Sequence, residues 1–364
     1  MKTLNRAKLP FKRVIFLKYS LLLLLCLAFF QSKADTESTY ITAYYPVINQ
    51  AELSIVANDY EKALSFYREA FSKVQEPFAK DIYNAAVCAT LVNDVKQAFN
   101  YLEDLVVKGV ELTYLERQDV FEPLHSHKRW KKFAKKYPKN RRKYQRKTDQ
   151  DVRADLDELY ARDQYFRQAK GGLRVYGDTL RKIENANVVI LREFIDKYGY
   201  PGEALIGVAD TLEDLPRFSI VIQRQTKAKK GYDFSPILKS AVSAGKLSPQ
   251  AAAFLMDQQI GSNLYRSRVL VKVKCNTSKK CQEEIDNSSL SSYLTEKISE
   301  EEEEKVNTIR AEIGLESLRD YKRKVLYSLN DKRFKLNYTW SVTNYNVPSK
   351  EAAEVLTENL IAVE

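Results

Sequence analysis

The residues of this chain that could do chemistry are polar side chains set in or beside apolar helix faces of its second half. Asp163 and Arg167 lie four positions apart near one apolar stripe, and Asn187 interrupts another stripe three residues after Glu184. A polar side chain on a buried face needs partners, and for Asn187 the commoner partner is a neighbouring backbone group. If these side chains instead face one cleft, they form a polar pocket, and Glu184 and Asp257 could serve as acid and base. The candidate binding residues are Asp163, Gln164, Arg167, Glu184, Asn187, Gln223 and Asp257.

Familiar catalytic and metal-binding motifs are absent from the sequence. It contains no G-x-S-x-G, no H-E-x-x-H and no phosphate-binding loop. The two histidines of the chain, His125 and His127, would point in different directions on a helix. Two histidines without a neighbouring cysteine or carboxylate cluster are also a poor zinc site. We therefore predict no catalytic residue, no metal ligand and no cofactor, and expect a binding role rather than an enzyme.

The first 34 residues have the composition of a secretory signal peptide. They carry seven Lys and Arg and no acid, with the apolar run Leu21–Phe30 followed by Ser32 and Ala34. The run is short for a membrane span. We expect cleavage after Ala34, export to the periplasm or the cell exterior, and no transmembrane span in the mature chain. Cleavage lowers the net charge by seven, from +11 to +4. An uncleaved amino-terminal anchor stays open as the alternative.

Three cysteines follow this segment. Cys275 and Cys281 flank the polar loop NTSKK and could close a small disulfide ring, which export would permit. Sequence spacing alone does not fix the geometry, so the free dithiol stays open. Cys88 lies among small apolar residues and is expected to be a buried thiol.

An internal repeat organises the amino-terminal half. The segment starting ANDYEKA at Ala57 matches VNDVKQA at Val92, 35 residues later, with alanines and large apolar residues in equivalent places. This pattern resembles the tetratricopeptide repeat, a pair of antiparallel helices in which small residues allow close approach. The resemblance implies a two-repeat helical solenoid over residues 40–137. A solenoid end must cover its last apolar face, and Trp130 is the expected lid.

The basic run after Pro138 predicts a linker over residues 138–150. It has few apolar residues and cannot form a core by itself. Tyr137 and Tyr144 are interleaved with the charges, as in a single-strand nucleic-acid groove, but export argues against nucleic acid. We expect a solvated linker that could associate peripherally with acidic lipid or glycan of the envelope.

The remaining sequence predicts a mostly helical region over residues 151–328 and a strand–helix tail over residues 329–364. Helices are expected from about Asp151 to Lys170, Asp178 to Tyr198 and Lys350 to Ala362. Alternating apolar residues predict strands in RVLVKVK and in RFKLNYTWSV. The expected fold class is therefore mainly α, with the repeats followed by an α+β domain that has a few strands near the carboxy terminus.

A second resemblance covers about Asp151 to Tyr327. The segments ARDQYFR, ENANVVILREFIDKYGYPG, IVIQRQ and AAAFLMDQQ occur in the order of an uncharacterised bacterial family, a domain of unknown function. Its members commonly have histidine at the positions of Tyr198 and Arg224, and arginine at that of Gln258. If those histidines act in catalysis or metal binding, that chemistry is absent from this divergent chain.

Two functions follow from these observations. The first is an exported cell-envelope protein with a non-catalytic role, in which the repeat groove binds an unknown protein or peptide and the second domain recognises a further ligand. The alternative is a divergent envelope hydrolase that uses carboxylates of the second domain. Geometry separates them: an open cleft shared by Asp163, Glu184 and Asp257 would favour a site, whereas buried and paired side chains would be structural.

Overall fold

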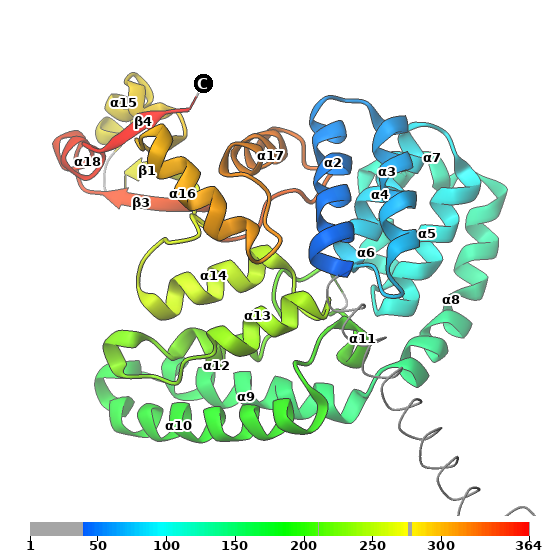
Figure 1. The fold of residues 1–364 in the computed structure, drawn as a ribbon, viewed down its shortest axis with the longest axis horizontal. Helices are drawn as coiled ribbons and strands as arrows, with labels where there is room; N and C mark the ends of the chain where they lie inside the picture. Colours follow the sequence, from blue (N-terminus) through cyan, green and yellow to red (C-terminus); the bar gives the residue numbers. More distant parts are fainter. Residues whose placement is uncertain (1–38, 210, 276–278, 364) are drawn as a thin grey trace, which may run out of the picture.

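The protein was analysed as a computed structural model that describes residues 39–209, 211–275 and 279–363. The predicted signal peptide lies outside the described residues. The chain is mainly helical with one small mixed sheet near its carboxy end, which confirms the expected fold class. Figure 1 shows the repeat helices α2 to α8 beside α17, with the long helices α9 and α10 along one edge and the sheet with α15 and α18 at the far corner.

Two helical hairpins with matching turns form the amino-terminal part. Asn58 and Asn93 both adopt left-handed backbone at φ +58° and +59°, and Asp59 and Asp94 each cap the next helix through a side-chain bond of 3.1 Å. The same turn therefore recurs after 35 residues. The hairpins follow the short π-helix η1 (Tyr40–Tyr44) and consist of α2 (Tyr45–Val56), α3 (Tyr60–Lys73), α4 (Ala79–Leu91) and α5 (Val95–Lys108).

Short helices and one long helix cover the open end of the second hairpin. Trp130 is buried against Phe99 and Phe133, with ring centroids 6.2 and 5.4 Å away. It therefore covers α5 as expected of a solenoid lid. His125 packs on the Trp130 ring, and His127 caps the long helix. These helices are α6 (Leu112–Glu116), α7 (Glu122–His125) and α8 (Lys128–Lys147).

The prediction of a basic linker is wrong, because residues 138–147 continue α8 as helix. Tyr144 is buried and lies against Gly109 and Gly207, whose Cα atoms leave no room for a side chain. Gly207 has φ +68°, a conformation that suits glycine. The buried side chains of α8 follow one another at helical spacing on both sides of Pro138. This narrow stripe packs against the rest of the protein and is enough to order a very basic helix.

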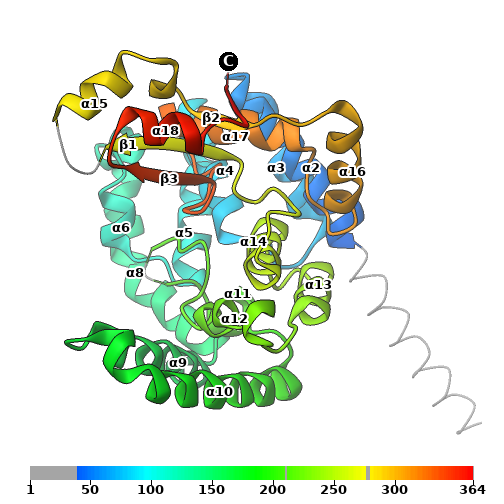
Figure 2. The same cartoon turned by 90° about the vertical axis from the view of Figure 1, so that its left-hand side faces the viewer.

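The second half begins with two long neighbouring helices and continues through shorter ones. The expected helices around residues 151–170 and 178–198 are confirmed, the second with a kink at Tyr176. Figure 2 shows this pair forming one layer beneath α11 to α14. The helices are α9 (Gln150–Gln168), α10 (Gly172–Tyr198), α11 (Glu203–Ile206), α12 (Ser219–Arg224), α13 (Ser235–Ser243) and α14 (Pro249–Ile260).

A four-stranded sheet with strand order β3-β1-β2-β4 closes the chain. β1 (Leu270–Cys275) fulfils the first strand prediction and pairs in parallel with β3 (Val342–Val347). Cys275 and Cys281 are joined as a disulfide, with Cα atoms 6.0 Å apart. The other elements are α15 (Lys279–Asp286), β2 (Leu294–Glu296), α16 (Glu300–Ala311), α17 (Leu318–Asn330), α18 (Lys350–Leu356) and β4 (Leu360–Ala362).

The second strand prediction is wrong, since the strand begins only at Val342. The alternating residues Phe334 and Leu336 are buried against the repeats rather than in a sheet. Asn84 of α4 donates to the Lys335 carbonyl at 3.1 Å and accepts from the Lys335 amide at 2.8 Å. The segment consists of turns and bends, and the backbone of Lys335 finds both of its partners in one side chain of α4, so the alternating pattern did not produce a strand here.

These contacts also join the predicted domains. One hydrophobic core runs from the repeats through α9 to α14 and on to the segment of residues 334–340. β3 lies in the predicted tail yet pairs with β1, so the tail is part of the same sheet. The repeats and the second half are therefore packed together without a free linker between them.

We predict that Asn84→Ala destabilises the protein by about 2 kcal/mol or more, because it leaves both backbone groups of Lys335 without their partner. Urea unfolding would measure the change. Asn100→Ala, at an exposed position of α5, is the matched control and should stay within about 0.5 kcal/mol of the native protein. Equal stabilities of the two variants would contradict the structural role of Asn84.

Candidate functional site

The sequence-predicted residues of α9 and α10 form a buried ion network. Asp163 is paired with Arg167 at 3.2 Å and with Arg224 of α12 at 3.0 Å. Arg167 also contacts Glu184, which lies 3.5 Å from Lys229. Each of these two carboxylates is buried and has two basic partners. The network joins α9, α10 and α12. Neither Asp163 nor Glu184 is left without a counter-charge, so neither is suited to act as an acid or base.

The three amide side chains of the predicted set, Gln164, Asn187 and Gln223, do not form a shared site. Gln164 donates to Asp163 at 2.8 Å. Asn187 donates to the Leu159 carbonyl at 3.0 Å, as expected of a structural amide, while its oxygen is buried without a partner among the described residues. Gln223 is partly buried on α12 and bonds to none of the other six.

Asp257 belongs to a different place in the fold. It is fully buried on α14 and accepts from the Tyr265 amide at 3.0 Å and from the amide and hydroxyl of Ser267 at 3.2 and 2.7 Å. Burial raises its pKa, although these hydrogen bonds oppose the rise. Asp257 shares no partner with Glu184. The two cannot act as the expected acid–base pair, and both are structural by the criterion of burial and pairing.

A cavity lies instead between the inner face of the repeats and the second half. Its volume is about 130 Å³, and one side of it is open to solvent. That is room for several waters or a small ligand. The apolar part of its wall includes Tyr45, Ile48, Phe78, Pro201, Leu247 and Leu336. Its charged residues are Glu52, Asp81, Glu203, Glu213, Asp214 and Glu316, with Lys80, Lys246 and Lys324.

Ion pairs neutralise four of the six wall carboxylates. Lys324 of α17 binds Glu52 of α2 at 2.6 Å and Glu316 at 2.9 Å. Burial disfavours the charge of Lys324, but the two carboxylates outweigh burial and raise its pKa. Outside the cavity, Lys108 binds Glu203 at 3.2 Å and Arg153 binds Glu213 at 3.1 Å. These ion pairs hold together a cavity wall whose elements are far apart in the sequence.

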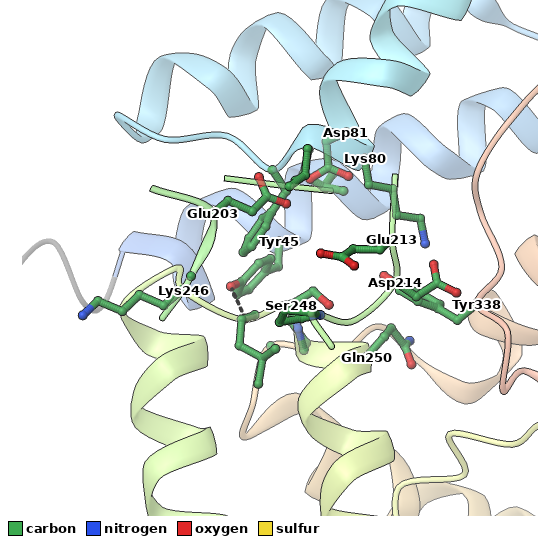
Figure 3. A pocket seen from close by; sticks show the side chains of 18 of the residues that line it. Tyr45, Lys80, Asp81, Glu203, Glu213, Asp214, Lys246, Ser248, Gln250 and Tyr338 are labelled. Atoms are coloured by element: carbon green, nitrogen blue, oxygen red, sulfur yellow. Dashed lines mark hydrogen bonds between the residues drawn. The ribbon is translucent and has the colours of Figure 1, made fainter. Parts of the chain in front are cut away.

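Asp81 and Asp214 are the two wall carboxylates with no basic group within 4.0 Å among the described residues. Asp81 accepts from the Tyr44 hydroxyl at 2.6 Å. Burial, with the nearby charge of Glu52, raises the pKa of Asp81 to about 7. Asp214 accepts from the Thr339 amide at 2.7 Å. Figure 3 shows both side chains beside the cavity, with the carboxylate of Glu213 between them.

Lys80 and Lys246 differ in how they could meet a ligand. Lys80 donates to the Asn337 carbonyl at 3.3 Å, and its amine lies 3.1 Å from the centre of the Tyr338 ring. Burial lowers the pKa of Lys80, opposed by the charges of Asp214 and Glu52. Lys246 points away from the middle of the cavity. The cavity wall is therefore rich in acids, and the ammonium groups of Lys80 and Lys324 are both already engaged.

Sequence reasoning missed this site because its residues come from six separate stretches of chain, which are residues 45–52, 78–81, 200–216, 246–250, 314–324 and 336–338. Asp81 and Lys80 lie in the first turn of α4, and Asp214 lies in the loop after α11. No sequence spacing relates Asp214 to Lys80 and Asp81, since the loop and α4 are far apart in the chain. Tyr200, Pro201 and Gly202, in the turn between α10 and α11, also line the cavity. Proline-rich loops between helices were the one available signal.

The described residues contain no group of three or more His, Cys, Asp or Glu suited to a metal ion. In the same part of the chain, every helix is too short or too polar to cross a bilayer. No protein-family model matches the sequence, and no similar curated protein or solved structure was found. The resemblances to the tetratricopeptide repeat and to the bacterial family of unknown function stay predictions.

We predict that Asp81→Asn makes the protein less sensitive to rising pH. The pKa of Asp81 is about 7 in the folded protein and about 3.9 in an unfolded chain. The folded state therefore holds a proton that the unfolded chain releases. This contribution to stability is complete below the unfolded pKa and is lost as pH rises through 7.

The variant should consequently be the more stable protein at pH 8, by about 1 kcal/mol or more, and the difference should shrink at pH 5. Urea unfolding across this pH range would measure it. Asp119→Asn, at an exposed position, should follow the native curve. A difference between Asp81→Asn and the native protein that does not vary with pH would contradict the assignment.

We predict that Lys324→Met destabilises the protein by about 3–5 kcal/mol, because Glu52 and Glu316 lose the cation they share in a buried setting. Thermal or urea unfolding measures the loss. Arg323→Met changes an exposed neighbour on α17 and should have little effect. A double variant with Glu52→Gln and Lys324→Met should recover part of the stability if the unpaired charge is the cause.

Proposed function

We propose that this protein is a non-catalytic binding protein that holds a small ligand with a cationic group in the cavity between its repeats and its second half. The observation that carries the proposal is the difference among the wall carboxylates. Four have basic partners within 3.2 Å, whereas Asp81 and Asp214 have none. A cavity rich in carboxylates attracts a positive charge, and the apolar wall would contact the rest of the ligand.

A small ligand fits the geometry better than a peptide in the repeat groove. The inner face of α4, where a peptide was expected, carries residues of the chain itself. Asn84 binds both backbone groups of Lys335, and Lys80 binds the Asn337 carbonyl. A protein partner would have to displace this segment and its buried Phe334 and Leu336. We retain export to the cell envelope as part of the proposal, supported by the composition of residues 1–34.

Acid–base catalysis is a second candidate, favoured by one observation. The pKa of Asp81 is about 7, which suits a group that exchanges protons near neutral pH. A hydrolase of this kind would use Asp81 rather than Glu184 or Asp257. It would show turnover with an inflection near pH 7 that Asp81→Asn abolishes. Ligand binding without turnover would separate the first function from this one.

We predict that a small amine raises the melting temperature of the full chain. Putrescine, agmatine and arginine are suitable probes, with glutamate and glucose as controls of other charge. Calorimetric titration would then give the affinity. Asp214→Asn should weaken it roughly tenfold or more, because a charged hydrogen-bond partner is lost.

Asp196→Asn is the matched control, since Asp196 is exposed on α10 and does not line the cavity. It should bind like the native protein. The proposal fails if no amine stabilises the chain, or if Asp214→Asn and Asp81→Asn both bind as tightly as the native protein.

A further inference from the structure

Helix α8 presents an uncommon density of positive charge to solvent. Residues 128–147 contain twelve Lys and Arg, and no Asp or Glu occurs between Glu122 and Asp149. Like charges one turn apart repel each other on a helix. Figure 1 shows α8 along the outer edge of the repeats, beyond α5. Eleven of the twelve are exposed: Lys128, Arg129, Lys131, Lys132, Lys135, Lys136, Lys139, Arg142, Lys143, Arg146 and Lys147.

The protein neutralises only two of these exposed cations. Lys136 pairs with Glu103 at 2.9 Å, and Lys147 pairs with Glu76 at 2.8 Å. The other nine have no carboxylate within 4.0 Å among the described residues. Elsewhere on the surface, lysine and arginine commonly alternate with acids, as in the pair of Arg162 with Glu158. The basic face of α8, meaning these nine side chains, therefore lacks counter-charges of its own.

We propose that the basic face of α8 binds the surface of a membrane that contains anionic lipids. A helix of twenty residues is about 30 Å long, and its cations are held in fixed positions because the opposite side is docked through Trp130, Phe133 and Tyr144. An anionic leaflet attracts such a cluster over a distance of about one Debye length. The protein would lie on the bilayer with α8 against the headgroups, without inserting an element.

The rings of α8 favour a lipid surface over single-stranded nucleic acid. Binding of single strands relies on aromatic side chains that stack with bases between the cations. Trp130 and Tyr144 are buried, and Tyr137 packs against the core. The exposed face thus offers charge without stacking surfaces. This inference rests on observations separate from those of the cavity and does not depend on the cationic ligand.

Lysine footprinting of the full chain tests the contact locally, so that any membrane affinity of residues 1–34 does not confuse it. The protein is acetylated in the presence of phosphatidylcholine vesicles with and without phosphatidylglycerol, and modification is read by mass spectrometry. We expect Lys131, Lys135 and Lys139 to lose reactivity severalfold only on the anionic vesicles. Lys170 and Lys182, which are exposed near or on α10, should react equally in both.

A charge variant tests the energetics. Neutralising Lys131, Lys135, Lys139 and Arg142 with glutamine should lower partitioning onto anionic vesicles by roughly a hundredfold or more, since each of the four charges contributes up to about fivefold. Neutralising Lys170, Arg174, Arg181 and Lys182 changes the net charge equally and should have a much smaller effect. The proposal is overturned if anionic vesicles do not protect the α8 lysines. It is also overturned if DNA protects them and vesicles do not, or if the two variants partition alike.

Discussion

The buried contact of Lys324 with Glu52 and Glu316 is the interaction on which the rest of the structure depends. Glu52 and Lys324 are 272 positions apart in sequence, yet their charged atoms lie 2.6 Å apart. Two carboxylates around one ammonium are tolerated inside a protein only when the geometry satisfies each charge. The contact therefore fixes α17 against α2, and its three residues form part of the cavity wall.

The buried carboxylates of the molecule are of two kinds. Some are paired with a basic side chain and stabilise the fold, and others have no basic partner and remain available to a ligand. Asp163 and Glu184 have arginine partners and fasten helices to one another. Asp81 lies in a similarly buried place without a basic partner, and its pKa rises to about 7 for that reason. Burial alone does not mark a functional carboxylate. Burial without a counter-charge, beside an open space, is the more informative combination.

The repeats serve in this chain as a surface for the rest of the protein. Two repeats bury too little apolar area to stand alone, and their inner face is covered by the segment around Lys335 and by α17. Asn84 supplies the partners of both backbone groups of Lys335, which lies outside the sheet. The segment around Lys335 fills the groove and also forms part of the cavity wall, since Leu336 and Tyr338 line the cavity. A helical scaffold and a ligand cavity thus come from the same packing.

The sequence by itself determined the features that arise from neighbouring residues. The turns at Asn58 and Asn93, the helices around residues 151–198 and strand β1 all follow from local capping, periodicity and alternation. Tertiary structure alone decided the features that depend on distant partners. It ordered the basic run as α8, kept the segment before Val342 out of the sheet, and placed Asp81 and Asp214 in the wall of one cavity. The reason is physical: local patterns fix backbone preferences, whereas ion pairing and burial depend on which surfaces meet.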